Sequence, residues 1–165
     1  MSIDHVLLVA GGKVDSGAKV ARCMEKSEIV SVVEHLPEPQ ECWVALAYTD
    51  DFTDHDMGTV IKYVLTHAKS HGFTGKIDFE DIIIVVDALR MMVENAIGKT
   101  INGRERYSRQ TILDVLDIDR SQFVPSRFWG RMESMVDKIT HALDCGALDA
   151  VDDFLRRRVQ RGEAA

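Results

Sequence analysis

Several features are scarce in this chain of 165 residues, and each scarcity excludes a class of protein. The three cysteines are an odd number without a Cys-x-x-Cys pair, so we expect neither a disulfide framework nor a zinc ribbon. The longest apolar runs, Val6–Ala10 and Ile82–Val86, fall far short of the roughly 20 residues that span a membrane. Met1–Ala10 lacks the basic segment of a signal peptide. We therefore expect a cytoplasmic protein that does not associate with a membrane.

Common catalytic and metal-binding motifs are missing as well. Gly11-Gly12-Lys13 lacks both the first glycine and the following Ser or Thr of a phosphate-binding loop. His67 and His71 stand four residues apart, a spacing that suits zinc on a helix, but the glutamate of the metalloprotease motif is absent. We expect a protein that is not an enzyme and that holds no cofactor and no metal.

Charge is unevenly distributed along the chain. The net charge is −7, yet residues 1–98 hold 8 basic and 16 acidic residues, whereas residues 99–165 hold 12 and 11. Lys99–Arg131 alone holds 7 basic against 4 acidic residues, and six of the seven are arginines, which bind phosphate and guanine in a bidentate manner. An acidic first part and an arginine-rich second part suggest two different partners. The alternative is a solvated helix face without a partner.

Apolar residues recur at helical spacing through most of the chain, which predicts a mostly α protein. We expect an N-terminal arm or extension over residues 1–39, with a helix from Ser16 to Leu36, and a compact helical body over residues 40–165. Gly98 and Gly146 are expected to end helices. The β-branched run Ile82–Val86 is also compatible with a buried strand, but helical spacing favours a helix with Ile82 and Val86 facing inward. The helices expected in the body are Gln40–Thr49, Gly58–His71, Asp78–Ile97, Ser108–Leu116, a segment from Ser121 or Pro125 to Leu143, and Leu148–Val159.

A helix-turn-helix is predicted near residues 108–132. Ser108 caps a helix with Ile112, Leu113 and Leu116 facing inward, and Ile118 fills the angle between two helices across a short turn. Arg120 opens the second helix, and Phe123 faces back onto the first.

Two features of this segment depart from the helix-turn-helix pattern. Asp117 occupies the turn position where glycine is common, and Pro125 falls inside the second helix, so that this helix either begins irregularly or begins near Ser126. An αα-hairpin in an ordinary helical bundle remains the alternative.

The candidate site residues are arginines and small polar residues around this segment. In the second helix, we expect Arg120, Gln122, Ser126 and Arg127 to reach base edges, because arginine and glutamine hydrogen-bond to purines. Upstream of the second helix, Arg104, Arg106 and Arg109 are expected to contact phosphate. Ser121 and Arg131 complete the predicted DNA-binding set.

The order of these segments resembles a known family. Trp43–Thr49 (WVALAYT), an acidic loop and Val60–Ala68 (VIKYVLTHA) look like the central part of the late-gene antitermination factors, the Q proteins of lambdoid phages. A second long helix, then Tyr107-Ser108-Arg109, Pro125 and Trp129-Gly130-Arg131, is similar to the C-terminal part of that family. The resemblance covers residues 42–155 and consists mainly in the order of segments. Some members carry a cysteine-rich zinc insertion where this chain has only Gly98–Arg106, so the resemblance implies a shorter, metal-free branch.

The resemblance implies a factor that binds double-stranded DNA in a bacterial host and loads onto RNA polymerase paused just after initiation. It would then suppress termination by acting at the RNA exit channel. Nascent RNA at that channel and self-association on DNA are further contacts compatible with this interpretation. Two alternatives stay open: a plain helix-turn-helix repressor or activator, and an acidic interaction or inhibitor protein that does not bind nucleic acid.

Overall fold

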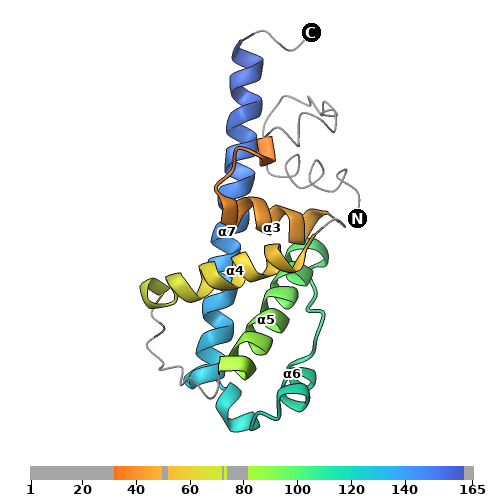
Figure 1. Cartoon of the computed structure of the whole chain (residues 1–165), viewed down its shortest axis with the longest axis vertical. Coiled ribbons are helices and arrows are strands. Elements are labelled where there is room, and N and C mark those ends of the chain that lie inside the picture. The colour runs from red at the N-terminus through yellow and green to blue at the C-terminus, as the bar shows by residue number, and fades with distance from the viewer. Residues whose placement is uncertain (1–31, 50–51, 72, 74–81, 162–165) are drawn as a thin grey trace.

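The computed structural model describes residues 32–49, 52–71, 73 and 82–161 (Figure 1). Over these ranges the chain is mainly helical and contains no strand, which confirms the predicted mostly α class. Most of the predicted N-terminal arm, including Ser16 and Val6–Ala10, lies outside the described residues. The α-helices are α3 (Glu38–Tyr48), α4 (Asp54–His67), α5 (Ile82–Asn102), α6 (Arg109–Leu116) and α7 (Phe128–Gln160), joined by the 3-10 helices η1 (Lys69–His71) and η3 (Arg120–Phe123).

Helix α7 is the element against which the others pack. Its 33 residues make it about 50 Å long. Helices α3, α4 and α5 all contact it, and α3 also packs on α4 (Figure 1). No helix within the described ranges is long and apolar enough to cross a membrane.

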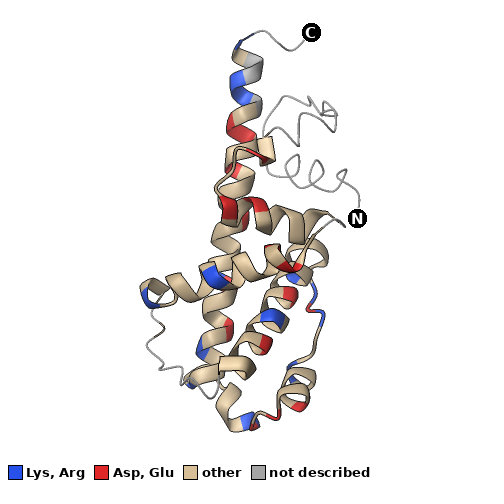
Figure 2. Cartoon of the chain, viewed as in Figure 1, with Lys and Arg blue, Asp and Glu red and all other residues tan. Residues whose placement is uncertain are grey.

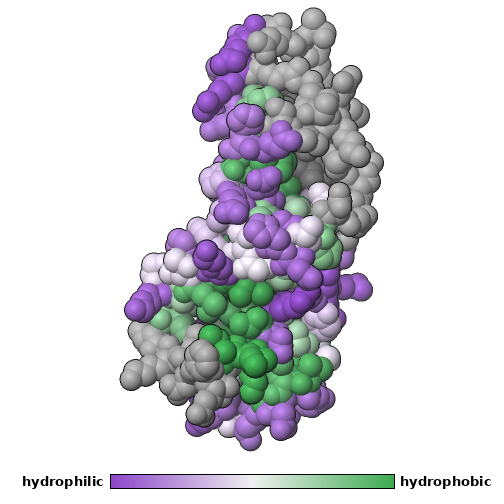
Figure 3. All heavy atoms as spheres, viewed as in Figure 1, coloured by the Kyte–Doolittle hydropathy of each residue, from purple (hydrophilic) through white to green (hydrophobic). Residues whose placement is uncertain are grey.

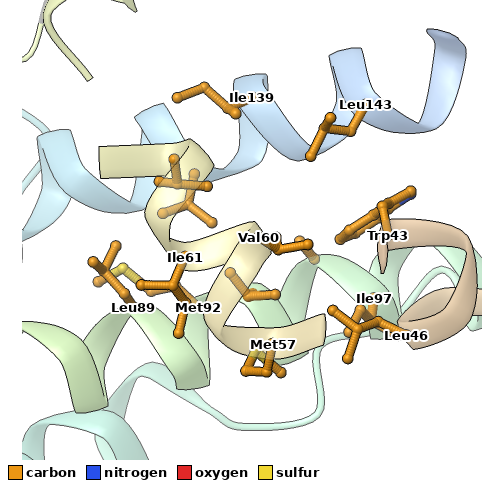
Figure 4. Close-up of a cluster of buried hydrophobic side chains, with 14 of the residues drawn as sticks. Trp43, Leu46, Met57, Val60, Ile61, Leu89, Met92, Ile97, Ile139 and Leu143 are labelled. Carbon is orange, nitrogen blue, oxygen red and sulfur yellow. The ribbon is translucent and has the colours of Figure 1, made fainter. Parts of the chain in front are cut away.

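A single apolar core joins these four helices (Figure 4). Trp43, Val60 and Leu89 are 0% exposed, and Ile139 of α7 is 1% exposed. Burying a large apolar side chain contributes roughly 1.5–3 kcal/mol. Leu36 belongs to the same core, so the boundary predicted at residue 39 falls inside the packed part of the chain.

Helix α4 begins four residues earlier than the predicted Gly58. Thr53 and Asp56 form a capping box, in which the Asp56 N–H donates to Thr53 Oγ1 at 3.3 Å and the Thr53 N–H donates to Asp56 Oδ2 at 2.6 Å. The end of the acidic segment that we expected to be a loop is therefore the first turn of the helix. At its other end α4 stops at His67, and the 3-10 helix η1 covers the rest of the predicted range.

The two glycines that were expected to end helices lie inside them. Helix α7 continues through Gly146. The glycine leaves room for α3, since a Cβ on Gly146 would lie 2.5 Å from Gln40 Nε2. Helix α5 runs past Gly98 to Asn102, and a Cβ on Gly98 would lie 2.5 Å from the Arg104 carbonyl oxygen. Both predictions of a helix end were wrong, since the missing side chain makes room for a neighbouring segment.

The first turn of α5 is exposed and apolar. The run Ile82–Val86 is helical, as the spacing favoured, but only Val85 of that run is buried. Ile82 and Val86, which we expected to face inward, are 42% and 38% exposed, and Ile83 is 71% exposed. In Figure 3 apolar residues gather below α4 and over this end of α5.

Candidate nucleic-acid interface

Helix α6 has the cap and the inward face that the sequence predicted. Ser108 Oγ accepts a hydrogen bond from the Thr111 N–H at 3.1 Å, and Ile112 and Leu113 are buried. The helix ends at Asp117, which adopts the left-handed conformation with φ 52°, while the Ile118 N–H donates to the Leu113 carbonyl at 3.0 Å. This is the Schellman arrangement, in which glycine is the usual residue at the left-handed position.

The second helix of the predicted helix-turn-helix does not begin at Arg120. Residues Arg120–Phe123 form a single 3-10 turn, Val124 is extended with ψ 150°, and α7 begins only at Phe128. Pro125 explains this, because proline disfavours the helical conformation in the residue before it. Of the two predicted starts, the one at Ser121 is wrong, and the helix begins close to the later alternative.

Five of the predicted DNA-binding residues therefore lie in the connection between α6 and α7. These residues, on segment 117–127, are Arg120, Ser121, Gln122, Ser126 and Arg127. Arg131, also predicted to bind DNA, lies in the first turn of α7.

The connection is packed firmly onto α7. A Cβ on Gly130 would lie 2.1 Å from the Val124 carbonyl oxygen and 2.8 Å from the Pro125 nitrogen, so the two backbones touch directly. Phe123 is buried and faces back onto α6 as predicted, where the Arg109 guanidinium lies 5.3 Å from its ring centroid. Residues 123–125 of the connection are thus held between α6 and α7.

The arginines of the connection are exposed. Within the described residues, Arg120, Arg127 and Arg131 make no ion pair. Asp119 lies among them, and its Oδ1 accepts a hydrogen bond from the Ser121 N–H at 2.7 Å. The bonds from Ser121, together with the positive charge of Arg127, lower the pKa of Asp119. This end of the molecule therefore carries both signs of charge (Figure 2).

Arg104 and Arg106 lie on a separate segment, which runs beside the last turns of α5 (Figure 2). Both are exposed, and neither makes an ion pair within the described ranges. Glu105, which stands between them, binds Lys99 Nζ at 3.1 Å. Lys99 also binds Asp137 of α7 at 2.9 Å. Burial alone would lower the pKa of Lys99, but its bonds to the two carboxylates raise it overall.

Asn95 holds the end of this segment. It is 4% exposed, its Oδ1 accepts from the Tyr107 N–H at 2.7 Å, and its Nδ2 donates to the Tyr107 carbonyl at 3.0 Å. The Tyr107 hydroxyl donates to Glu94 Oε2 at 2.5 Å, and this bond, together with burial, raises the pKa of Tyr107. The sequence interpretation missed Asn95. The only signal was a polar residue within the apolar stripe of a long helix.

Arg109 differs from the other predicted arginines. Its guanidinium binds Glu133 Oε2 at 2.7 Å and also lies over Phe123. Arg109 therefore joins α6 to α7, in addition to any contact with phosphate.

Comparisons with known proteins leave the chain without a match. No family model, no curated protein and no solved structure matches it. Among the described residues, no three His, Cys, Asp or Glu side chains gather in a way that could hold a metal ion.

Proposed function

We propose that the chain is a DNA-binding transcription antitermination factor. It would load onto bacterial RNA polymerase paused just after initiation and suppress termination at the RNA exit channel. The DNA-binding part rests on one observation: Arg104, Arg106, Arg120 and Arg127 make no ion pair within the described residues, and they stand on backbone segments that are braced against α5 and α7. The polymerase part rests on the resemblance of the order of segments to that of the late-gene antitermination factors.

The segment from α6 to the start of α7 would act as the DNA-reading module. A regular helix-turn-helix is not shown here, so in this proposal α6 would be the supporting helix and the 3-10 turn with the first turn of α7 would take the place of a recognition helix. Arg120, Gln122, Ser126 and Arg127 would approach base edges. A good bidentate contact of this type contributes roughly 1–3 kcal/mol of discrimination against the wrong base.

Arg104 and Arg106 would contact phosphate. Neither makes an ion pair within the part of the chain that the structure describes, and the acid between them is bound to Lys99. Each phosphate contact releases counterions, so affinity falls steeply with salt.

The acidic part of the chain would face the second partner. Glu38, Glu41, Asp54 and Asp56 lie in the first turns of α3 and α4. Such acids favour helix N-termini, and DNA phosphates would repel them. A surface of polymerase is the partner that the resemblance names.

The binding test uses duplex DNA and a salt series, measured by fluorescence anisotropy. We expect Arg104→Ala and Arg106→Ala to weaken binding to every sequence and to flatten the slope of log affinity against log salt by about 0.9 each. Arg120→Ala and Arg127→Ala should weaken binding to the cognate site much more than to random DNA. The matched control is Lys62→Ala, which removes an exposed charge from α4.

Two results would contradict this assignment. Equal losses on cognate and random DNA would move Arg120 and Arg127 to the class of phosphate contacts. A slope that changes no more than in the Lys62→Ala control would exclude Arg104 and Arg106 from the interface.

A further inference from the structure

The segment that carries Arg104 and Arg106 is held against α5 by contacts at its start, its middle and its end. Its backbone lies against Gly98, where a Cβ would come within 2.5 Å of the Arg104 carbonyl oxygen. Its middle residue, Glu105, is bound to Lys99. At its end, the main-chain N–H and carbonyl of Tyr107 make two hydrogen bonds with the side-chain amide of Asn95.

The three side chains of this segment are all exposed, but they differ in their partners. Glu105 binds Lys99, which also binds Asp137, whereas Arg104 and Arg106 on either side of it make no ion pair within the described residues. Arg104 and Arg106 are thus a pair of exposed cations on a braced backbone.

The buried amide of Asn95 is the costly part of this arrangement. A polar side chain within the apolar face of a helix is destabilising unless its hydrogen bonds are made, and among the described residues they are made to the main chain of Tyr107. The amide therefore joins the loop to the helix.

We propose that Asn95 and Lys99 are positioning residues for DNA binding. They hold the loop of residues 103–107 in one conformation, so that Arg104 and Arg106 meet the phosphate backbone without first having to be ordered. This inference rests on the proposed function. Pre-ordering a site raises affinity by removing the entropy cost that binding would otherwise carry.

A double-mutant cycle on the full chain tests this role, with a short duplex of random sequence as the probe. We expect Asn95→Ala to weaken DNA binding about fivefold to tenfold in the wild-type background. In the Arg104→Ala/Arg106→Ala background the same substitution should have almost no effect, because the side chains that it positions are gone. Tyr107→Phe, which removes only the bond to Glu94, should show the same dependence on background with a smaller loss.

The outcomes separate this inference from the proposed function. If Asn95→Ala weakens binding equally in both backgrounds, or not at all, the positioning role is wrong while the proposed function stands. If the double arginine variant itself binds DNA like the wild type, the phosphate contacts of the proposed function are wrong. Should Asn95→Ala fail to fold, Tyr107→Phe and Lys99→Met decide the question by the same comparison.

Discussion

Gly130 provides the sharpest test of how the connection between α6 and α7 is held. Alanine at this position would place its Cβ 2.1 Å from the Val124 carbonyl oxygen and 2.5 Å from the Val124 carbonyl carbon. Both atoms belong to the backbone, so relief requires the connection to move away from α7 by about 1 Å. Overpacking of this kind costs about 1–3 kcal/mol, and the better helix propensity of alanine returns less than about 1 kcal/mol. We expect Gly130→Ala to lower the free energy of unfolding by about 2 kcal/mol.

Two other glycines serve as matched controls. Gly58 is exposed in α4 with no atom within 4 Å of its Cβ position, so Gly58→Ala should stabilise the protein by about 0.5–1 kcal/mol. At Gly146 the close atom is the end of the flexible Gln40 side chain, so the gain and the clash of Gly146→Ala should nearly cancel.

The assay is thermal and urea unfolding followed by circular dichroism. A loss of 2 kcal/mol corresponds to a fall in Tm of about 4–8 °C for a chain of this length. The three variants should rank Gly58→Ala, Gly146→Ala, Gly130→Ala in order of falling stability. If Gly130→Ala is as stable as the wild type, the backbone contact between the connection and α7 does not exist, and the placement of Arg120 and Arg127 fails with it.

Three further substitutions test other parts of the fold. Asp117→Gly should raise the free energy of unfolding by about 1 kcal/mol in a urea titration, because glycine adopts the left-handed conformation without strain; a loss would contradict the cap. Asp144→Ala should lower the free energy of unfolding by roughly 3 kcal/mol in the same titration, because the Trp43 indole and the Tyr48 hydroxyl, two buried donors on α3, lose their acceptor. A loss below about 1 kcal/mol would mean that water replaces the Asp144 carboxylate as the acceptor. Burial alone would raise the pKa of Asp56, but the hydrogen bonds from Thr53 lower it overall. The wild type should therefore be more stable than Asp56→Asn at neutral pH and should lose that advantage as the pH falls through the lowered pKa. An advantage that persists in acid would contradict the capping box.

Local patterns in the sequence were sufficient to predict most helices. Spacing of apolar residues located α3, α5 and α6, and Ser108 marked the start of α6. Pro125 gave the reason why a regular second helix could not begin at Ser121. These signals work because they act within a few residues of the chain.

The errors came from contacts between distant segments. A glycine that ends a helix and a glycine that admits a neighbour look the same in a sequence, and the segments that lie against Gly98 and Gly146 could not be known in advance. Contacts between distant segments also explain what the sequence could not predict about the candidate site. Arg109 was selected by its charge alone, but its partner Glu133 lies 24 positions away on another helix.

The most direct test of the proposed function is a single-round transcription assay with purified bacterial RNA polymerase. The template carries a promoter, the binding element of the factor and a downstream terminator, and the assay counts terminated and readthrough RNA. We predict that the protein raises the readthrough fraction with initiation nearly unchanged, and that the effect persists when the terminator is moved farther downstream. If total RNA changes while the readthrough fraction stays constant, the protein is a regulator of initiation, and antitermination is wrong.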